Sequence, residues 1–173
     1  APAGSGLAGG GPGAGRPGER ASAPVPVGLG RVGELPEPMT LAAFADLVAS
    51  VLPDTVPGVL AGGPPQATVR RVALCTGSGD SMLGDARRAG ADVYLTADLR
   101  HHPASEHLES GPPYLVLGTH YATEAPVLDA LAALLRRRTA DGDRLAVTVS
   151  RRVTDPWTYR ATVQHTPDRG DRP

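Results

Sequence analysis

The sequence has little of what marks several large classes of protein. It contains one cysteine, Cys75, which cannot form a disulfide within the chain and which stands in an apolar run, as expected of a buried thiol in a cytoplasmic protein. The 17 basic and 18 acidic residues leave a formal net charge of −1, so the overall charge gives no signal for nucleic acid or for an anionic membrane. No apolar run approaches the roughly 20 residues that a membrane-spanning helix needs. These absences favour a cytoplasmic protein.

Glycine and proline, in contrast, are abundant, with 22 and 18 residues, and they are concentrated at the start of the chain. Residues 1–26 consist mainly of Gly, Pro, Ala, Ser and Arg and lack the apolar core of a secretory signal. Such a segment cannot bury enough apolar surface to offset the entropy of ordering its backbone. We expect a disordered linker over 1–26, an ordered part over 27–160 and a polar tail over 161–173. Because the first residue is not methionine, we also expect the chain to be a fragment.

The ordered part alternates between helical and strand-like patterns. Apolar residues at helical spacing predict a helix over 41–52, with Thr40 as its N-cap and Pro53 as its terminator. The same reasoning predicts helices over 81–90, closed by Gly90, over 103–111, with Pro103 in the first turn, and over 124–138, with Leu128, Leu131 and Leu135 on one face. The predicted strands cover 69–80, 91–98, 113–120 and, near an edge, 144–152. This alternation indicates an α/β fold of βαβ units, with a mostly parallel sheet flanked by helices.

Three of the predicted strands end in polar clusters. These are "TGSGDS" (76–81), "TADLRHH" (96–102) and "GTHYATE" (118–124). In an open parallel sheet, ligands bind beyond the carboxyl ends of the strands, and all such ends lie at one edge. We therefore expect the three clusters to meet at a common rim.

The first two clusters admit both a functional and a structural interpretation. Gly77, Ser78 and Gly79 follow a strand and open a helix, as in a backbone cradle for an anion, although a tight glycine turn explains the same residues. Asp98, His101 and His102 are residue types that bind metals, carry protons or contact substrate. They fit a solvated loop equally well.

The third cluster contains His120 and Glu124, which are four residues apart and therefore share one face of a helix. Such a pair can ligate one metal ion or bridge two. The spacing alone does not decide, because His102 and Glu106 repeat it elsewhere in the chain. His120 differs in following an apolar strand directly, where its position is rigid.

Taken together, several segments resemble the C-terminal half of the NIF-three-like family, whose members are also called GTP cyclohydrolase 1 type 2 homologues. The resemblance covers about residues 27–160 in order, and the abundance of Ala, Gly, Pro and Arg resembles an actinobacterial member. The segments that carry it are "GLGRVGELPEPMTLAAFADLV" (28–48), "VALCTGSGDSML" (72–83), "GADVYLTADLRHH" (90–102), "GTHYATE" (118–124) and "VTDPWT" (153–158).

The resemblance implies an α/β protein that assembles as a homohexamer and holds two divalent metal ions, such as zinc, iron or manganese, in each subunit. It assigns metal ligation to His120 and Glu124, with the remaining ligands in an N-terminal half that this chain does not include. "RHHP" (100–103) looks like a His-His-Pro motif of that other half, but its neighbours match the C-terminal half. His101 and His102 are therefore expected at most to contact substrate, together with Asp98, Gly77, Ser78 and Gly79.

The family name implies metal-dependent hydrolysis with a nucleotide as the possible substrate. The alternative is a metal-binding regulatory or scaffold protein of the same fold without turnover. No catalytic residue can be named from the sequence, and we expect this chain alone to be inactive, since zinc usually takes three or four protein ligands.

Overall fold

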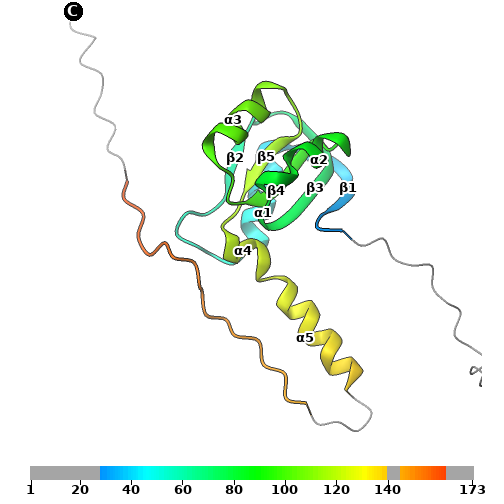
Figure 1. Cartoon of the computed structure of the whole chain (residues 1–173), viewed down its shortest axis with the longest axis vertical. Helices are drawn as coiled ribbons and strands as arrows, with labels where there is room; N and C mark the ends of the chain where they lie inside the picture. Colours follow the sequence, from blue (N-terminus) through cyan, green and yellow to red (C-terminus); the bar gives the residue numbers. More distant parts are fainter. Residues whose placement is uncertain (1–27, 140–144, 163–173) are drawn as a thin grey trace, which may run out of the picture.

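The structure, a computed structural model, describes residues 28–139 and 145–162 and contains a five-stranded sheet with helices on both faces (Figure 1). Its elements are, in chain order, β1 (Arg31–Thr40), α1 (Leu41–Val51), β2 (Leu60–Gly62), β3 (Thr68–Ser78), the 3-10 turn η1 (Asp80–Met82), α2 (Leu83–Arg88), β4 (Val93–Ala97), α3 (His101–Glu109), β5 (Tyr114–Leu117), α4 (His120–Glu124) and α5 (Val127–Arg138). The predicted linker 1–26 and most of the predicted tail 161–173 lie outside the described residues.

The strand order is β1-β3-β4-β5-β2. The three central strands β3, β4 and β5 are parallel, while β1 and β2 pair antiparallel with β3 and β5 at the two edges. The predicted α/β class is confirmed as a mixed sheet with a parallel centre. That parallel centre matters for function, because it brings the carboxyl ends of β3, β4 and β5 to the same edge.

Both faces of the sheet are covered by apolar side chains, as the period of two along a strand requires. Val93 and Val116 face α1, and they pack with its buried residues Leu41, Phe44 and Val48. Their neighbours Tyr94 and Leu115 face the opposite way, toward α2 and α3. One layer of helix on each side therefore holds the central strands rigidly in place.

Helix α1 follows the prediction closely. Thr40 is its N-cap, and the threonine Oγ1 accepts a hydrogen bond from the backbone N–H of Ala43 at 3.1 Å. The helix ends at Val51, one residue before the predicted end and two residues before Pro53. Gly90 likewise closes α2, with a φ of +65° that suits glycine after a helix.

The edge strands were not predicted correctly. Sequence patterns missed β1, which contains Pro36 and Pro38 and changes register between Glu34 and Met39, and they missed β2, which has three residues. Proline is tolerated in such a strand because an edge position does not need every N–H. The strand predicted over 144–152 is wrong for residues 145–152, which are extended but pair with no strand in the described chain.

Three predicted helices also differ in their boundaries. The helix predicted over 81–90 is the 3-10 turn η1 followed by α2, which covers only Leu83–Arg88. Helix α3 begins at His101 instead of 103, so that Pro103 is its third residue, which is allowed because the first four N–H groups have no acceptor within the helix. The helix predicted over 124–138 is α5, which begins at Val127, and a separate short helix, α4, precedes it.

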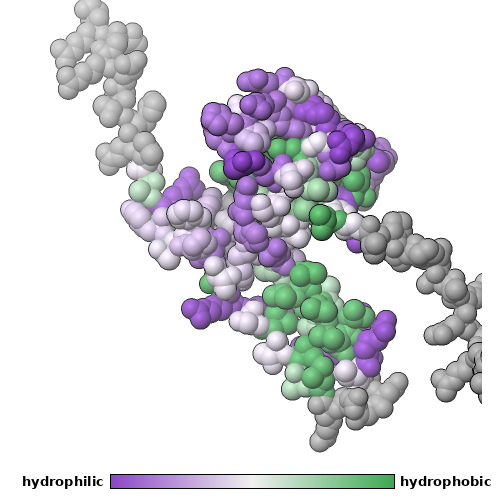
Figure 2. Space-filling view, in the orientation of Figure 1, coloured by the Kyte–Doolittle hydropathy of each residue, from purple (hydrophilic) through white to green (hydrophobic). Residues whose placement is uncertain are grey.

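Helix α5 projects from the sheet and leaves much of its apolar side exposed (Figures 1 and 2). The first part of the extended segment 145–162 runs beside it, held where Arg136 donates to the carbonyl of Val147 at 2.7 Å and Arg151 pairs with Asp129 at 2.5 and 2.9 Å. Within the described part of the chain, no helix is long and apolar enough to cross a membrane.

Candidate metal centre

The ends of the three parallel strands are hydrogen-bonded to one another. The N–H of Gly79, just after β3, donates to the carbonyl of Ala97 at the end of β4, at 3.3 Å. The N–H of Gly118, just after β5, donates to the carbonyl of Thr96 at 3.0 Å. The three polar clusters that follow these strands therefore share one rim, as the sequence predicted.

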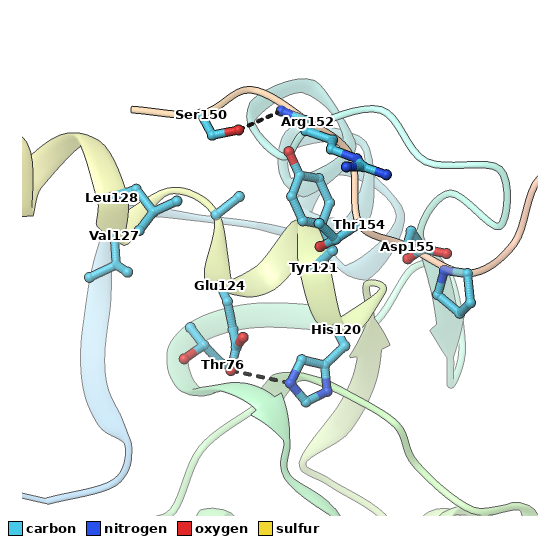
Figure 3. A pocket seen from close by; sticks show the side chains of 12 residues that line it. Thr76, His120, Tyr121, Glu124, Val127, Leu128, Ser150, Arg152, Thr154 and Asp155 are labelled. Carbon is cyan, nitrogen blue, oxygen red and sulfur yellow. Dashed lines mark hydrogen bonds and ion pairs between the residues drawn. The ribbon is translucent and has the colours of Figure 1, made fainter. Parts of the chain in front are cut away.

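Helix α4 begins at this rim and carries the pair with i, i+4 spacing. Thr119 is its N-cap, with Oγ1 accepting from the N–H of Ala122 at 3.3 Å. The helix places His120 and Glu124 on one face, with 3.3 Å between His120 Nε2 and Glu124 Oε1 (Figure 3). Both side chains are about half exposed. A nitrogen and an oxygen donor thus face each other at an accessible edge.

A second carboxylate contacts the other edge of the same imidazole. Asp98, directly after β4, places Oδ2 at 2.5 Å from His120 Nδ1. Asp98 has a φ of +54° and is the only non-glycine residue in the described ranges with a positive φ. The hydrogen bond to Asp98 raises the pKa of the His120 ring, and the nearby charge of Glu124 adds to this, while partial burial opposes it. His120 is therefore held between two acids, one on each ring nitrogen.

The turn after β3 forms the floor beneath the pair. Gly77 has a φ of +66°, and a Cβ at this position would lie 2.6 Å from Glu124 Oε1 and 3.1 Å from His120 Nε2. The N–H of Gly77 donates to Thr123 Oγ1 at 3.0 Å, which ties the turn to α4. Glycine leaves a small space here, bordered by the imidazole nitrogen and the carboxylate oxygen.

This turn is fixed from inside the sheet by two hydroxyl groups of β4. Thr96 Oγ1 donates to the carbonyl of Gly77 at 3.2 Å, and the Tyr94 hydroxyl donates to the carbonyl of Gly79 at 3.0 Å. Burial raises the pKa of Tyr94 to about 12, so its hydroxyl remains a donor across the physiological range. The floor of the site is therefore anchored to the core.

A cavity of about 670 Å³ opens beside the pair (Figure 3). Its walls come from Thr76, from α4 and the start of α5, and from the extended segment between Ser150 and Pro156. Tyr121 and Arg152 add a phenol and a guanidinium to the lining. The sequence had not singled out these two residues; the position of Tyr121 next to His120 was the available signal, whereas Arg152 lies too far along the chain.

The residues predicted to contact substrate are distributed unevenly. Asp98 and Gly77 lie at the pair itself. His101 lines a different hollow, beside β2 and α3, and packs edge-on against His102 with 5.3 Å between the ring centres. Ser78 is exposed, and the N–H groups of Gly77 and Gly79 are already bonded within the protein. Substrate contact by these residues stays a prediction.

His120 and Glu124 offer one nitrogen donor and one oxygen donor. Imidazole nitrogen and carboxylate oxygen suit zinc, iron or manganese, and the space above Gly77 separates the two donors without a side chain between them. Across the described ranges, however, no group of three His, Cys, Asp or Glu side chains is placed to hold an ion. Asp98 does not complete such a group, because it lies on the opposite edge of the His120 ring.

Comparison with known proteins decides the family. The model of the family Duf34/NIF3 (NGG1p interacting factor 3) matches residues 16–156. The chain belongs to the Duf34/NIF3 family. The recognition from sequence is thereby confirmed.

Curated NIF3 relatives include actinobacterial proteins. A protein of Streptomyces coelicolor named GTP cyclohydrolase 1 type 2 homolog is 48% identical over 132 residues, which are 76% of this chain and 46% of the relative. A protein of the same name from Mycobacterium tuberculosis is 44% identical over 134 residues, which are 78% of this chain and 35% of the relative. The chain thus spans about half or less of the length of the relatives that it matches.

Solved structures share the fold. A Bacillus cereus protein related to NIF3 has a TM-score of 0.69 at 30% identity and is matched over 76% of this chain and 36% of its own. A Staphylococcus aureus protein has the same TM-score at 32% identity, over 76% of this chain and 42% of its own. The likeness supports the α/β architecture described above.

Proposed function

We propose that this chain is the C-terminal part of a dinuclear-metal protein and supplies two ligands, His120 and Glu124, to its site. The observation that carries the proposal is the facing of His120 Nε2 and Glu124 Oε1, 3.3 Å apart, across the space that Gly77 leaves open. Their position at the rim of the parallel strands, next to a cavity large enough for a small molecule, supports it.

In the whole protein we propose metal-dependent hydrolysis, with a nucleotide as the substrate. Bound divalent cations would activate water and polarise the bond under attack. This chain's residues would bind the cations, line the cavity and exclude part of the solvent. The name GTP cyclohydrolase 1 type 2 homolog of the relatives is the support for a nucleotide. Assembly as a homohexamer and a cytoplasmic location belong to the same proposal.

The chain by itself is expected to bind metal weakly and to turn over nothing. Two protein ligands leave a cation mostly coordinated by water, whereas zinc sites usually use three or four protein ligands. The remaining ligands would come from the part of the relatives that this chain does not span. Two tightly held ions per chain after dialysis would contradict this expectation.

The test is metal content in the whole protein, measured by elemental analysis after dialysis. The variants His120→Ala and Glu124→Ala should each lose metal. His102→Ala and Glu106→Ala are matched controls, because they remove the same residue types at the same spacing from exposed positions on α3, and they should retain it. Retention in the first pair would remove the ligand assignment.

The same preparations separate an enzyme from a binding protein. Hydrolysis of GTP that disappears with the metal supports the hydrolase. GTP binding or assembly that depends on the metal, without turnover, supports the regulatory or scaffold alternative.

A further inference from the structure

The imidazole of His120 has two chemically different neighbours. On the Nδ1 edge stands Asp98 Oδ2 at 2.5 Å, and on the Nε2 edge stands Glu124 Oε1 at 3.3 Å. The first distance is that of a short, charge-assisted hydrogen bond, whereas the second is longer than such bonds usually are. A neutral imidazole carries one N–H, and the shorter contact is the better place for it.

Asp98 is held in this position by the backbone around it. It follows β4 directly, and β4 is the central strand of the parallel part of the sheet. Its φ of +54° turns the chain sharply at the strand end, a conformation that aspartate tolerates better than most residues. Sparsely populated backbone conformations persist where the surrounding structure fixes them, often at functional sites. The carboxylate is thus directed at the ring by two rigid elements, β4 and α4.

We propose that Asp98 is a positioning residue: it fixes the His120 ring with its N–H at Nδ1 and leaves the bare Nε2, on the side of Glu124 and Gly77, as the nitrogen that binds metal. The metal-binding half of this inference rests on the proposed function above, and the orientation half stands on the contact alone. Histidine ligands commonly donate their second N–H to a carboxylate, which fixes the tautomer and makes the ligating nitrogen more basic. This role differs from the substrate contact expected of Asp98 from the sequence.

The orientation is measured on this 173-residue chain without metal. Long-range ¹H–¹⁵N correlation spectra distinguish the two neutral tautomers, and they are recorded at a pH high enough that the His120 shifts no longer change. The wild type should show the N–H at Nδ1. Asp98→Gly keeps the positive φ free of strain while removing the carboxylate, and it should move His120 toward the Nε2–H form that free histidine prefers.

Two further variants keep the result specific. Asp98→Asn retains the shape and tolerates the same backbone conformation, so its uncharged amide oxygen should restore part of the Nδ1–H form. Asp85→Asn removes an exposed carboxylate on α2 that pairs with Arg88, away from the site, and it should leave the tautomer unchanged. A His120 tautomer that is the same in the wild type and in Asp98→Gly would overturn the proposal.

Zinc titration of the whole protein tests the consequence for metal. Asp98→Gly should weaken zinc binding about 10–100-fold, the range found when a partner of a ligating histidine is removed. A tautomer that changes with no change in zinc affinity would also overturn the proposal, because positioning would then have no effect on the metal. If His120→Ala binds zinc as the wild type does, the proposed function fails. The tautomer spectra would then still test whether Asp98 fixes the orientation of the His120 ring.

Discussion

Gly77→Ala tests the space between the imidazole and the carboxylate directly. The added methyl would lie 2.6 Å from Glu124 Oε1 and 3.1 Å from His120 Nε2, so one of the two side chains must move. Alanine at a φ of +66° also costs roughly 1–2 kcal/mol of backbone strain. The substitution therefore has a backbone effect and a site effect, and the experiment has to separate them.

Gly90→Ala is the matched control for the backbone effect. Gly90 has a φ of +65°, nearly the value at Gly77, and a Cβ there would meet no atom within 4 Å. The control should lose about 1 kcal/mol of unfolding free energy, which corresponds to roughly 4 °C in Tm for a domain of this size. Gly77→Ala should lose a similar amount or up to about 1 kcal/mol more, because His120 and Glu124 are half exposed and can rotate away.

The two variants should differ far more in metal binding than in stability. Urea unfolding followed by circular dichroism gives the free energies, and zinc titration of the whole protein gives the affinities. Gly90→Ala should bind as the wild type does, whereas Gly77→Ala should bind at least tenfold more weakly, since a methyl occupies the space that separates the two donors. Equal affinity in the two variants would refute the placement of the cation above Gly77.

Two other predictions concern stability. His107 is buried, with Nε2 2.8 Å from the carbonyl of Pro113, and burial lowers the pKa of its ring below the usual 6.5. As the pH falls, the unfolded chain therefore binds the proton before the folded chain does. The free energy of unfolding should be at its full value above about pH 6.5 and should decrease as the pH drops toward the folded-state pKa. Urea midpoints at several pH values should show a smaller acid loss in His107→Gln than in the wild type, and the exposed His102→Gln should not reduce that loss. Val116→Ala, in the fully buried centre of the sheet, should lower the free energy of unfolding by about 2 kcal/mol. Leu131→Ala, on the exposed side of α5, should change it by less than about 0.5 kcal/mol. Similar urea midpoints for the two variants would contradict the packing described for the core.

The parts of the fold that depend on local pattern were predictable from sequence. The spacing of Leu41, Phe44 and Val48, with Thr40 before them, defines α1 because capping and amphipathic spacing act within a few residues. The apolar strands that alternate with helices led to the parallel centre of the sheet. Parallel strands end at one edge, so the pattern also predicted that the three polar clusters meet there. That prediction placed the pair at the start of α4 at the common rim.

The parts that depend on pairing partners were not predictable. β1 contains two prolines, and only its place at an edge makes it a strand. Residues 145–152 have a suitable alternating pattern but pair with no strand within the described chain. A pattern records which side chains can be buried, whereas a strand also requires a neighbour with unpaired backbone groups.

The contact of Asp98 with the Nδ1 edge was hidden for a different reason. In the sequence Asp98 groups with His101 and His102, because the three residues are close in the chain. The positive φ at Asp98 turns its carboxylate toward His120 instead, while α3 carries His101 to a different hollow. Local proximity was misleading here because one backbone angle redirected the chain.

The hydroxyl groups of Tyr94 and Thr96 connect the rim of the sheet to the protein interior. Each side chain occupies a core position, and its hydroxyl donates a hydrogen bond to a carbonyl of the glycine turn beneath His120 and Glu124. Replacing either by an apolar residue of equal bulk would preserve packing yet release the loop on which the donors rest. Substitutions at these two positions in the middle of the sheet are therefore limited by the hydrogen bonds that the site needs as well as by side-chain size.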